Sequence, residues 1–522
     1  MLIRLRGLWY ADKVRRAGTA ARRGRDGRTP GPESPHGDRT FWPSPAPEPG
    51  APQALTARGR FPPLRLAQLD SMDTLVIQGG RPLRGPLHVG GSKNTMLPLM
   101  AAAVLADGVT TIRNVPALHD VLTFSNVLRV TGCRVSFSPD DTPETPDVMT
   151  IDATDLHHYE APYDLVNKMR ASFYMLGALL GRGGKAKVSL PGGCAWGPRP
   201  VDLHLKAMEA LGAQIEERHG YVFATAPGGR LTGGTIRFEP SSVGATINFL
   251  LAAVTARGES RIENAAAEPD VVVFGQMLQQ MGADLSGLGT DTITIRGVEK
   301  MNAVDFTNCP DRIELGTYMI AAAIAAEPGE TVRLTGANPD HLGEAFLDAF
   351  RLTGVPFSVG QGTVDVTGVA AIQPVSVEAA PYPGFPTDLQ AQWTVMMTQA
   401  AGASTVRDTV YTDRFKHIPE LRRLGADVRV EGDTVHVAGL AAGGAGDGAA
   451  HAQPRRLSGA TVMSTDLRAS VSLVLAGMVA EGETEVLRVY HLDRGYENLE
   501  GKLSQAGIAI VRSSDDTDEM PD

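Results

Sequence analysis

An internal repeat of about 70 to 80 residues constrains the fold of this 522-residue chain more than any other feature. In each copy an apolar helix rich in small residues runs to a glycine or a Pro-Gly pair, and a short strand follows. Six ordered copies are too regular for a chance recurrence of helix, glycine and strand. The copies read MLPLMAAAVLADGVTTIRN from Met96, ASFYMLGALLGRGGKAKVSL from Ala171, GATINFLLAAVTARGESRIEN from Gly244, ELGTYMIAAAIAAEPGETVRLTG from Glu314, LQAQWTVMMTQAAGASTVRD from Leu389 and LRASVSLVLAGMVAEGETEVLR from Leu467.

Each copy contains a second helix, which also ends in a glycine and runs into a strand. A glycine at that point is what a left-handed helix C-cap requires, because it has no β-carbon to clash. The endings are TGCRVSF (131–137), LGAQIEE (211–217), MGADLSG (281–287), TGVPFSV (353–359), LGADVRV (424–430) and AGIAIVR (506–512).

The two helices of a copy differ in polarity. The first is apolar on nearly all sides, which predicts a buried helix, whereas the second carries charge, as in DLHLKAMEALGA, and is expected to face solvent. Six such units divide naturally into two lobes of three. The sequence therefore predicts an α/β protein with two lobes, in which helices are buried inside and short sheets cover them.

Length and composition narrow the class of protein. A chain of 522 residues is expected to form two or more domains. The net charge of −10 argues against a general nucleic-acid binder, and three cysteines do not make a disulfide framework. No apolar run approaches the roughly 20 residues that span a bilayer. We expect a cytoplasmic protein with no membrane or obligate protein partner.

Residues 1–71 differ from the rest, being rich in Arg, Pro and Gly without lasting periodicity. Such a segment buries too little apolar surface to offset its chain entropy. It is interpreted as a disordered extension or as a translation start placed too early, since Met72 directly precedes the first good strand, Leu75–Gln78. A basic tail that binds polyanions is the alternative.

Polar and charged residues gather where the six apolar helices begin. Capping explains the Asp, Ser and Asn residues. It does not explain Lys or Arg at a helix N-terminus, where a cation is electrostatically misplaced unless an anion binds beside it. The sequence thus predicts a phosphate or carboxylate site. The residues are Lys93-Asn94, Lys168 and Arg170, Ser241-Ser242, Asp311-Arg312 with Glu314, Asp388, and Asp466 with Arg468; Arg199, Arg414 and Arg494 lie in further loops.

One cysteine stands apart from the other two. Cys194 lies in the loop PGGCAWGPRP (191–200), close to Arg199, where a thiolate is favoured. A free cysteine is ordinarily a small buried hydrophobe, and Cys133 fits that description. Cys309, just before Pro310, is uninformative. Metal-binding patterns such as Cys-x-x-Cys and His-Glu-x-x-His do not occur in the sequence, and neither a metal nor a cofactor is predicted.

Nine stretches, in order from about residue 75 to 512, resemble the UDP-N-acetylglucosamine 1-carboxyvinyltransferases, a family of enolpyruvyl transferases. The cysteine loop is highly specific in combination with the TDLRAS and DRGYE blocks. The stretches are GSKNTMLP (91–98), APYDLVNKMRAS (161–172), LPGGCAWGPRPVDLHL (190–205), SSVGAT (241–246), PDRIELGT (310–317), FPTDLQAQ (385–392), TDRFKHIPEL (412–421), STDLRAS (464–470) and YHLDRGYENLE (490–500).

The resemblance implies an inside-out fold of six βαβαββ units, three in each lobe, with the active site in the cleft between the lobes. Its first strand returns to the C-terminal lobe. Residues 93–309 are then expected to form the N-terminal lobe, which carries the Cys194 loop. Residues 72–92 and 310–522 are expected to form the C-terminal lobe.

The resemblance also implies the reaction. The 3-hydroxyl of UDP-N-acetylglucosamine attacks C2 of phosphoenolpyruvate while C3 gains a proton, and the adduct then expels phosphate. The catalytic residues carried over are Cys194 as acid, Asp388 as base, and Lys93 and Arg494 on the phosphate. The substrate-binding set comprises Lys93, Asn94, Arg170, Arg199, Pro200, Val201, Asp202, Leu203, Ser241, Ser242, Val243, Gly244, Asp311, Glu314, Asp388, Val410, Arg414, Asp466, Arg468 and Arg494.

Three other functions fit the sequence less well. The shikimate-pathway enolpyruvyl transferases share the six-unit architecture, but Gly-Gly-Cys and the DLHL block belong to the nucleotide-sugar branch. A non-catalytic paralogue would not be expected to keep Lys93, Cys194, Asp388 and Arg494 together. A structural repeat protein does not account for cations at buried helix starts.

Overall fold

The computed structural model describes residues 73–138, 147–166, 169–191, 201–440 and 456–513. The segment expected to extend over residues 1–71 lies outside this range. Within it, buried apolar side chains form two hydrophobic cores. The first core lies between Met96 and Met301. The second takes Leu75–Val89 together with Ile313–Ile510. An α/β protein with two cores confirms the predicted fold class, while the lobe boundaries stay a prediction.

The described strands form six four-stranded sheets, three beside each core. The sheets beside the first core are β14 (Asp305–Thr307), β3 (Val109–Arg113), β5 (Val148–Asp152) and β4 (Arg134–Ser138); β6 (Glu160–Ala161), β7 (Lys185–Ser189), β9 (Tyr221–Thr225) and β8 (Gln214–Arg218); and β10 (Thr235–Arg237), β11 (Glu259–Glu263), β13 (Thr292–Arg296) and β12 (Asp284–Ser286).

The sheets beside the second core are β2 (Leu87–His88), β15 (Thr331–Thr335), β17 (Thr363–Thr367) and β16 (Phe357–Gly360); β18 (Val377–Ala379), β19 (Ser404–Asp408), β21 (Thr434–Val437) and β20 (Val428–Glu431); and β22 (Thr461–Met463), β23 (Glu483–Leu487), β1 (Thr74–Gln78) and β24 (Ala509–Ser513).

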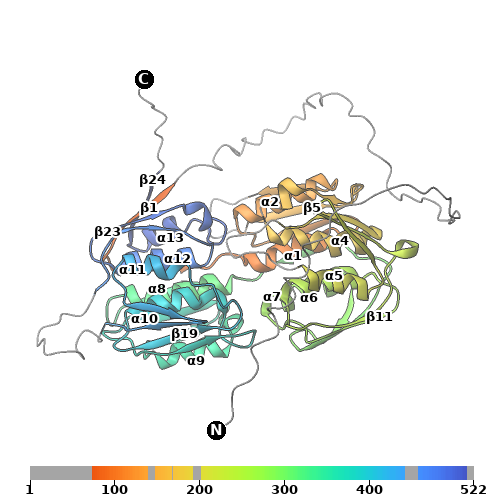
Figure 1. Cartoon of the computed structure of the whole chain (residues 1–522). Helices are drawn as coiled ribbons and strands as arrows, with labels where there is room; N and C mark the ends of the chain where they lie inside the picture. Colours follow the sequence, from red (N-terminus) through yellow and green to blue (C-terminus); the bar gives the residue numbers. More distant parts are fainter. Residues whose placement is uncertain (1–72, 139–146, 167–168, 192–200, 441–455, 514–522) are drawn as a thin grey trace, which may run out of the picture. The chain divides into compact units, whose positions relative to one another are not determined.

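All six sheets share one hydrogen-bonding pattern. In the order given, the first strand is parallel to the second, and the third is antiparallel to both of its neighbours. In the last sheet the third place is taken by β1, from the start of the described chain, as Figure 1 shows by its red-orange colour among blue strands. The beginning and the end of the described chain are thus joined in one sheet.

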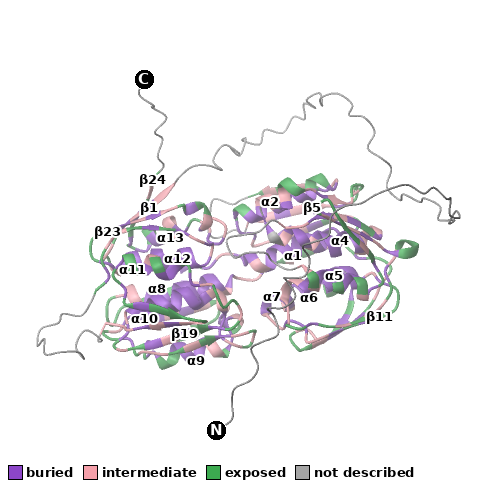
Figure 2. Ribbon diagram, viewed as in Figure 1, coloured by how far each residue is buried: buried purple, intermediate pink, exposed green. Residues whose placement is uncertain are grey.

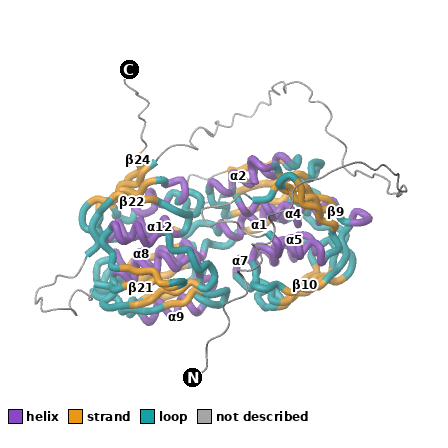
Figure 3. Tube along the Cα trace, viewed as in Figure 1, coloured by secondary structure: helices purple, strands orange, loops and turns teal. Residues whose placement is uncertain are grey.

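The first helix of each copy lies inside the sheets. These helices are α1 (Lys93–Ala103), α4 (Met175–Gly183), α6 (Val243–Ala253), α8 (Arg312–Ala325), α10 (Gln390–Thr398) and α12 (Ala469–Val479). Figure 2 shows α8 and α12 largely purple, the colour of buried residues, and Figure 3 shows strands on the outside of these helices. Residues that are apolar all round a helix can be buried on every side, so the predicted burial is confirmed.

Small residues let these helices approach closely. A β-carbon added to Gly177 of α4 would lie 2.3 Å from the carbonyl oxygen of Asn248 in α6, and one at Gly181 would lie 2.5 Å from that of Leu251. Both separations are far below any real carbon–oxygen contact. Glycine at these positions therefore sets the spacing of α4 and α6 in the first core.

The second helices lie nearer the surface and end as predicted. They are α2 (His119–Val130), α5 (Asp202–Ala210), α7 (Pro269–Gln280), α9 (Glu344–Leu352), α11 (His417–Arg423) and α13 (Leu499–Gln505). The glycine after each has a positive φ, from +76° at Gly354 to +105° at Gly282, as a left-handed C-cap requires. Shorter helical segments are α3 (Tyr163–Val166), η2 (Arg170–Tyr174), η3 (Pro227–Gly229), η4 (Pro339–Leu342), η5 (Thr387–Leu389) and η7 (Val489–His491).

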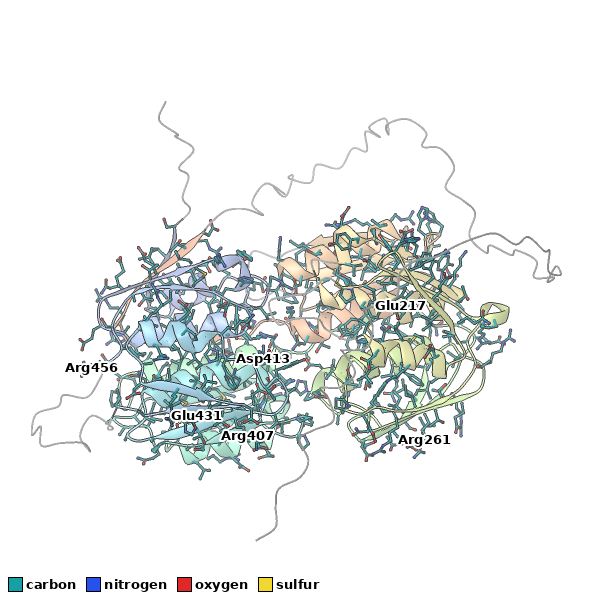
Figure 4. The ribbon with its side chains drawn as sticks, viewed as in Figure 1. Glu217, Arg261, Arg407, Asp413, Glu431 and Arg456 are labelled. Carbon is teal, nitrogen blue, oxygen red and sulfur yellow. The ribbon has the colours of Figure 1, made fainter. Side chains whose placement is uncertain are left out.

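The outer sheet faces are polar. Arg261 of β11, Arg407 of β19 and Glu431 of β20 are exposed at the surface of their sheets in Figure 4. Across strands, Arg333 pairs with Asp365 and Arg407 with Asp433. Among the helices of the described ranges, none combines the length and the apolar character that crossing a bilayer requires.

Candidate active site

Two chain segments run from one core to the other and lie side by side. Gly91 forms an isolated β-bridge with Pro310, and the backbone N–H of Ser92 donates to the carbonyl of Cys309 at 2.7 Å. Helix α1 begins directly after the first segment and α8 directly after the second. The N-termini of a first-core helix and a second-core helix are therefore adjacent.

Asp311 joins these two helix starts. Its Oδ1 atom caps α8 by accepting from the N–H groups of Ile313 and Glu314. Its Oδ2 atom accepts from the N–H of Lys93 at 3.2 Å and lies 3.4 Å from Nη2 of Arg468. The same carboxylate thus serves as a cap, as predicted, and as the partner of a buried cation.

Lys93 begins α1 and is almost fully buried. Its Nζ atom lies 2.7 Å from Oδ2 of Asp120, the second residue of α2. Burial lowers the pKa of Lys93, and the carboxylate of Asp120 opposes that effect only in part. Conversely, burial would raise the pKa of Asp120, but Lys93 and Arg494 together hold that pKa below its ordinary value.

Arg494 reaches the same carboxylate from the second core. Its Nε atom lies 2.9 Å from Oδ1 of Asp120, and its Nη2 atom lies 3.4 Å from Oδ2. The Arg494 side chain is 30% exposed, whereas that of Asp120 is 6% exposed. Lys93 and Arg494, two of the cations predicted to hold phosphate, therefore meet at one carboxylate, although they are 401 positions apart in the sequence.

Arg468 is a third cation of this group and is 2% exposed. Besides Asp311, it contacts the carbonyl of Gly495 at 3.3 Å and lies with Nε 3.7 Å from Oδ2 of Asp388. Its guanidinium carbon is 5.4 Å from the centre of the Tyr496 ring. Burial would lower the pKa of Arg468, but Asp311 and the other anions outweigh burial and keep the guanidinium charged.

Asp388 lies in η5, just before α10. Nη1 of Arg414 donates to its Oδ1 atom at 2.7 Å and to the hydroxyl of Thr387 at 3.3 Å. Burial acts to raise the pKa of Asp388, but Arg414 and then Arg468 hold the pKa well below its usual range. The carboxylate is therefore ionised and flanked by two guanidinium groups.

Two predicted carboxylates are occupied by groups of the protein itself. Asp466 caps α12 through the N–H groups of Arg468 and Ala469. Glu314 accepts from the N–H of Gly90, the hydroxyl of Tyr318 and Nζ of Lys502, with separations of 2.6 to 2.7 Å. Both residues hold helix starts and the crossing segment in place.

The charge pattern differs in one respect from the sequence-based expectation. Cations at buried helix starts predicted an external anion, yet those whose side chains the structure describes have a carboxylate partner from another element. Lys93 pairs with Asp120, which also holds the loop cation Arg494, Arg468 pairs with Asp311, and Arg312 pairs with Asp270 at 3.0 Å. Tertiary folding brings these carboxylates in, because an unpaired buried charge is too costly.

Comparison with known proteins places the chain among enolpyruvyl transferases. A family model described as EPSP synthase (3-phosphoshikimate 1-carboxyvinyltransferase) matches residues 77–503. A UDP-N-acetylglucosamine 1-carboxyvinyltransferase of Chloroherpeton thalassium is 49% identical over 451 residues, covering 86% of this chain and 99% of the relative. That of Chlorobaculum parvum is 50% identical over 442 residues, covering 84% and 98%.

The chain belongs to the UDP-N-acetylglucosamine 1-carboxyvinyltransferase family.

Solved structures of other proteins have the same fold. The enolpyruvyl transferase NikO from Streptomyces tendae is 27% identical, with a TM-score of 0.74, and the match covers 85% of this chain and 99% of NikO. EPSP synthase from Acinetobacter baumannii matches with a TM-score of 0.66 at 18% identity, covering 85% of this chain and all of that chain, which shows the shared fold.

Several further residues of the predicted substrate-binding set lie at the starts of two first-core helices and in a second-core loop. Val201, Asp202 and Leu203 begin α5. Ser242 caps α6 by accepting from the N–H of Ala245 at 3.3 Å, with Ser241 before it and Val243 and Gly244 after it. A β-carbon at Gly244 would lie 3.1 Å from the ring of His204, so a side chain there would crowd the start of α6. The N–H of Val410 donates to Asp408.

Several family assignments fall on parts of the chain that the structure does not describe. Cys194, Arg199, Pro200 and Lys168 lie outside the described residues. Arg170 is described through its backbone, as the first residue of η2. Asn94 is the second residue of α1 and is half-buried. The roles assigned to all these residues stay predictions.

Sequence reasoning missed Asp120 and Asp270, although a signal was present in the sequence. An aspartate stands in the first turn of α2, α5 and α7, or four to six residues before α9, α11 and α13: Asp120, Asp202, Asp270, Asp340, Asp413 and Asp493. Read singly, each looks like an ordinary helix-start acid. Aligning the repeats would have marked the position. Only the fold shows that two of these aspartates contact the opposite core.

Proposed function

We propose that this chain transfers the enolpyruvyl group of phosphoenolpyruvate to the 3-hydroxyl of UDP-N-acetylglucosamine and releases phosphate. The observation that carries the proposal is the meeting of Lys93 and Arg494 at one carboxylate, next to Arg468 and the ionised Asp388. Stationary positive charge of this kind suits a substrate that carries both a phosphate and a carboxylate. Relatives of the same name, about half identical in sequence, support the choice of acceptor.

In the addition step, the 3-oxygen of the sugar bonds to C2 of phosphoenolpyruvate. Asp388 accepts the hydroxyl proton, and the Cys194 thiol gives a proton to C3, which becomes a methyl group. In the elimination step, the bond from C2 to the phosphate oxygen breaks, the Cys194 thiolate takes back a methyl proton, and the departing phosphate takes the proton that Asp388 holds. The double bond is thereby restored, and phosphate departs against Lys93 and Arg494. Atoms and charge balance without any further reactant.

The electrostatics around Asp388 define what it can do. A carboxylate whose pKa is held low by Arg414 and Arg468 is a weak base at equilibrium. We therefore infer that Asp388 binds the 3-hydroxyl and takes its proton as the C–O bond forms, when the hydroxyl becomes acidic. Its fixed position between two guanidinium groups then supplies orientation as well as basicity.

The substrates are expected to bind among elements of both cores, because the first core provides Lys93 and the second provides Asp388, Arg414, Arg468 and Arg494. Both partners of the reaction are small molecules, and the proposal includes neither a nucleic acid nor a cofactor. Three cysteines in 522 residues favour a reducing compartment, so we place the reaction in the cytoplasm.

Phosphate release from phosphoenolpyruvate tests the proposal. We expect release that depends on UDP-N-acetylglucosamine and is absent with shikimate 3-phosphate as acceptor. Asp388→Asn is expected to abolish turnover while the protein still binds UDP-N-acetylglucosamine, because the amide keeps the shape of the side chain without its charge. Release with shikimate 3-phosphate alone would assign the chain to the other branch. Binding without turnover in the wild type would identify a non-catalytic paralogue.

A further inference from the structure

Asp120 joins two cations whose helices and loops pack on different cores. It lies in the first turn of α2, whose Val121 and Phe124 belong to the first core. Arg494 lies between Leu492 and Tyr496, which belong to the second core. The carboxylate belongs to a side chain that is 6% exposed, and it accepts from Lys93 on one side and Arg494 on the other. One buried anion therefore sets how far apart these two cations stand.

The contacts with Asp120 do not use every donor of the two cations. A lysine ammonium carries three N–H donors and an arginine guanidinium five. Asp120 is contacted by Nζ of Lys93 and by Nε and Nη2 of Arg494. Within the described part of the chain, Asp120 therefore engages neither Nη1 of Arg494 nor all three Nζ hydrogens of Lys93. Phosphate can accordingly bind to the remaining donors while the carboxylate keeps its own bonds.

A second contact holds the Arg494 loop against the same helix start. The N–H of Ala117 donates to Oε1 of Glu497 at 2.8 Å. Two residues of this loop therefore contact the beginning of α2. Arg494 pairs with the carboxylate of Asp120, and Glu497 accepts from the backbone N–H of Ala117. Because Arg494 is 30% exposed at its side chain, it would otherwise be free to turn toward solvent.

The equivalent aspartate of the third repeat provides a natural comparison. Asp270 is the second residue of α7, as Asp120 is of α2. It also contacts the other core, through Nε of Arg312 at 3.0 Å. It also accepts from the hydroxyls of Ser92 and Thr95 at the start of α1. Asp270 therefore links the cores beside the crossing segments, and its hydrogen bonds with described residues involve neither Lys93 nor Arg494.

We propose that Asp120 is a positioning residue for phosphate recognition, which holds Lys93 and Arg494 on one carboxylate so that their free donors face a single phosphate. The inference rests on the proposed function only in naming phosphoenolpyruvate as the phosphate that binds there. Without the carboxylate, the two cations repel each other, and Arg494 loses its fixed orientation. Binding of phosphate must then also fix the positions of the two cationic side chains, and this ordering lowers the affinity.

Calorimetric binding of inorganic phosphate and of phosphoenolpyruvate tests this inference without requiring turnover. Asp120→Asn keeps the shape of the side chain and removes its charge, and we expect both ligands to bind about tenfold or more weakly. Asp120→Glu keeps the charge and is expected to lose less affinity for both ligands than Asp120→Asn. If the Asn variant does not fold, the affinity of the Glu variant for phosphate is the test. Asp270→Asn is the matched control: it removes the equivalent link between the cores and should lower thermal stability with phosphate affinity unchanged.

Turnover adds a readout that a purely structural role would not give. In Asp120→Asn the KM for phosphoenolpyruvate is expected to rise, while the KM for UDP-N-acetylglucosamine stays as in the wild type. Unchanged or tighter phosphate binding by Asp120→Asn would overturn the inference, since Asp120 would then be a competitor of phosphate. Equal losses in Asp120→Asn and Asp270→Asn, or no phosphate binding by the wild type, would also overturn it. A wild type that binds phosphate but does not turn over would refute the proposed function alone.

Discussion

The Nη1 atom of Arg414 lies 2.7 Å from the Oδ1 atom of Asp388, so the carboxylate proposed as the base stands in an ion pair. Arg468 approaches the other carboxylate oxygen at 3.7 Å. A base enclosed in this way stays ionised at acidic pH, although each neighbouring cation weakens its basicity. The reaction therefore depends on a compromise between ionisation and proton affinity at Asp388.

Replacing Arg414 is expected to change both the ionisation and the proton affinity of Asp388. In Arg414→Met the pKa of Asp388 is expected to rise, because the nearer of its two guanidinium charges is gone while burial still disfavours the carboxylate. The acidic limb of the kcat profile should then move to higher pH, besides any loss of overall rate. A pH series from acidic to neutral conditions measures the limb in both proteins. Arg407→Met, on the outer face of β19, is the control and should leave the limb in place; an unmoved limb in Arg414→Met contradicts the assignment of Asp388.

Removing Arg468 is expected to destabilise the protein strongly. Arg468→Met leaves Asp311 and Asp388 without one of their cations and the carbonyl of Gly495 without a donor. Breaking a buried pair from one side costs on the order of 3 kcal/mol or more. Denaturant or thermal unfolding measures the loss. Arg333→Met removes an exposed pair on a sheet surface and should have an effect within experimental error.

His417 predicts a stability loss on acidification. The ring begins α11, is fully buried and has no hydrogen-bond partner on either nitrogen among the described residues. Burial, followed by the charge of Arg414, lowers its pKa to about 3. The unfolded chain has a value of about 6.5, so it binds the proton more readily than the folded protein. Stability from this ring is complete above that pH and declines as the pH falls toward 3.

Comparison of two histidine variants measures this contribution. His417→Met removes the titrating group, so its unfolding temperature should fall less steeply between pH 6.5 and 4 than that of the wild type. Expressed as the free energy of unfolding, the pH dependence of the wild type should be steeper than that of the variant by up to about 1.4 kcal/mol per pH unit. His436→Met, at a partly exposed position on β21, is expected to follow the wild type. Identical slopes in the wild type and His417→Met would show that the ring is already protonated or hydrated.

Alkylation by an epoxide phosphonate of the fosfomycin type is expected to mark Cys194 alone. The other two thiols are poor nucleophiles, because burial raises the pKa of Cys309 to about 12 and also raises that of Cys133. Peptide mass spectrometry after treatment locates the adduct. Cys133→Ala and Cys309→Ala should be labelled as the wild type is, and Cys194→Ala should not be labelled. A mass increase on either buried cysteine would count against the assignment.

Local patterns predicted the elements well. The glycine endings of the second helices predicted left-handed caps, and all six glycines have the positive φ that such caps need. Apolar residues on every side of the first helices predicted burial, and α12 is buried from Ala469 to Met478. These features depend on residues near one another in the chain. Periodicity and steric demands of single residues therefore suffice to predict them.

The pairing of charges could not be predicted in the same way. The cations at the helix starts were recognised, but their partners were not, because Lys93 meets Asp120 from another helix and Arg494 meets it from 374 residues away. Each aspartate by itself has the composition and position of an ordinary helix-start residue. Coulomb interactions depend on distances in space, which no local pattern contains.

The sequence alone thus determined the repeat, the inward-facing helices, the caps and the set of candidate cations, since these follow from hydrophobic burial and backbone sterics within short segments. Only the tertiary structure decided which carboxylate neutralises which cation, and that Asp120 and Asp270 link the two cores while Asp388 lies between Arg414 and Arg468. The physical reason is that a buried charge is stable only beside an opposite one, and folding is what brings residues more than a hundred positions apart to between 2.9 and 3.4 Å, as in the pairs of Arg494 with Asp120 and of Arg468 with Asp311.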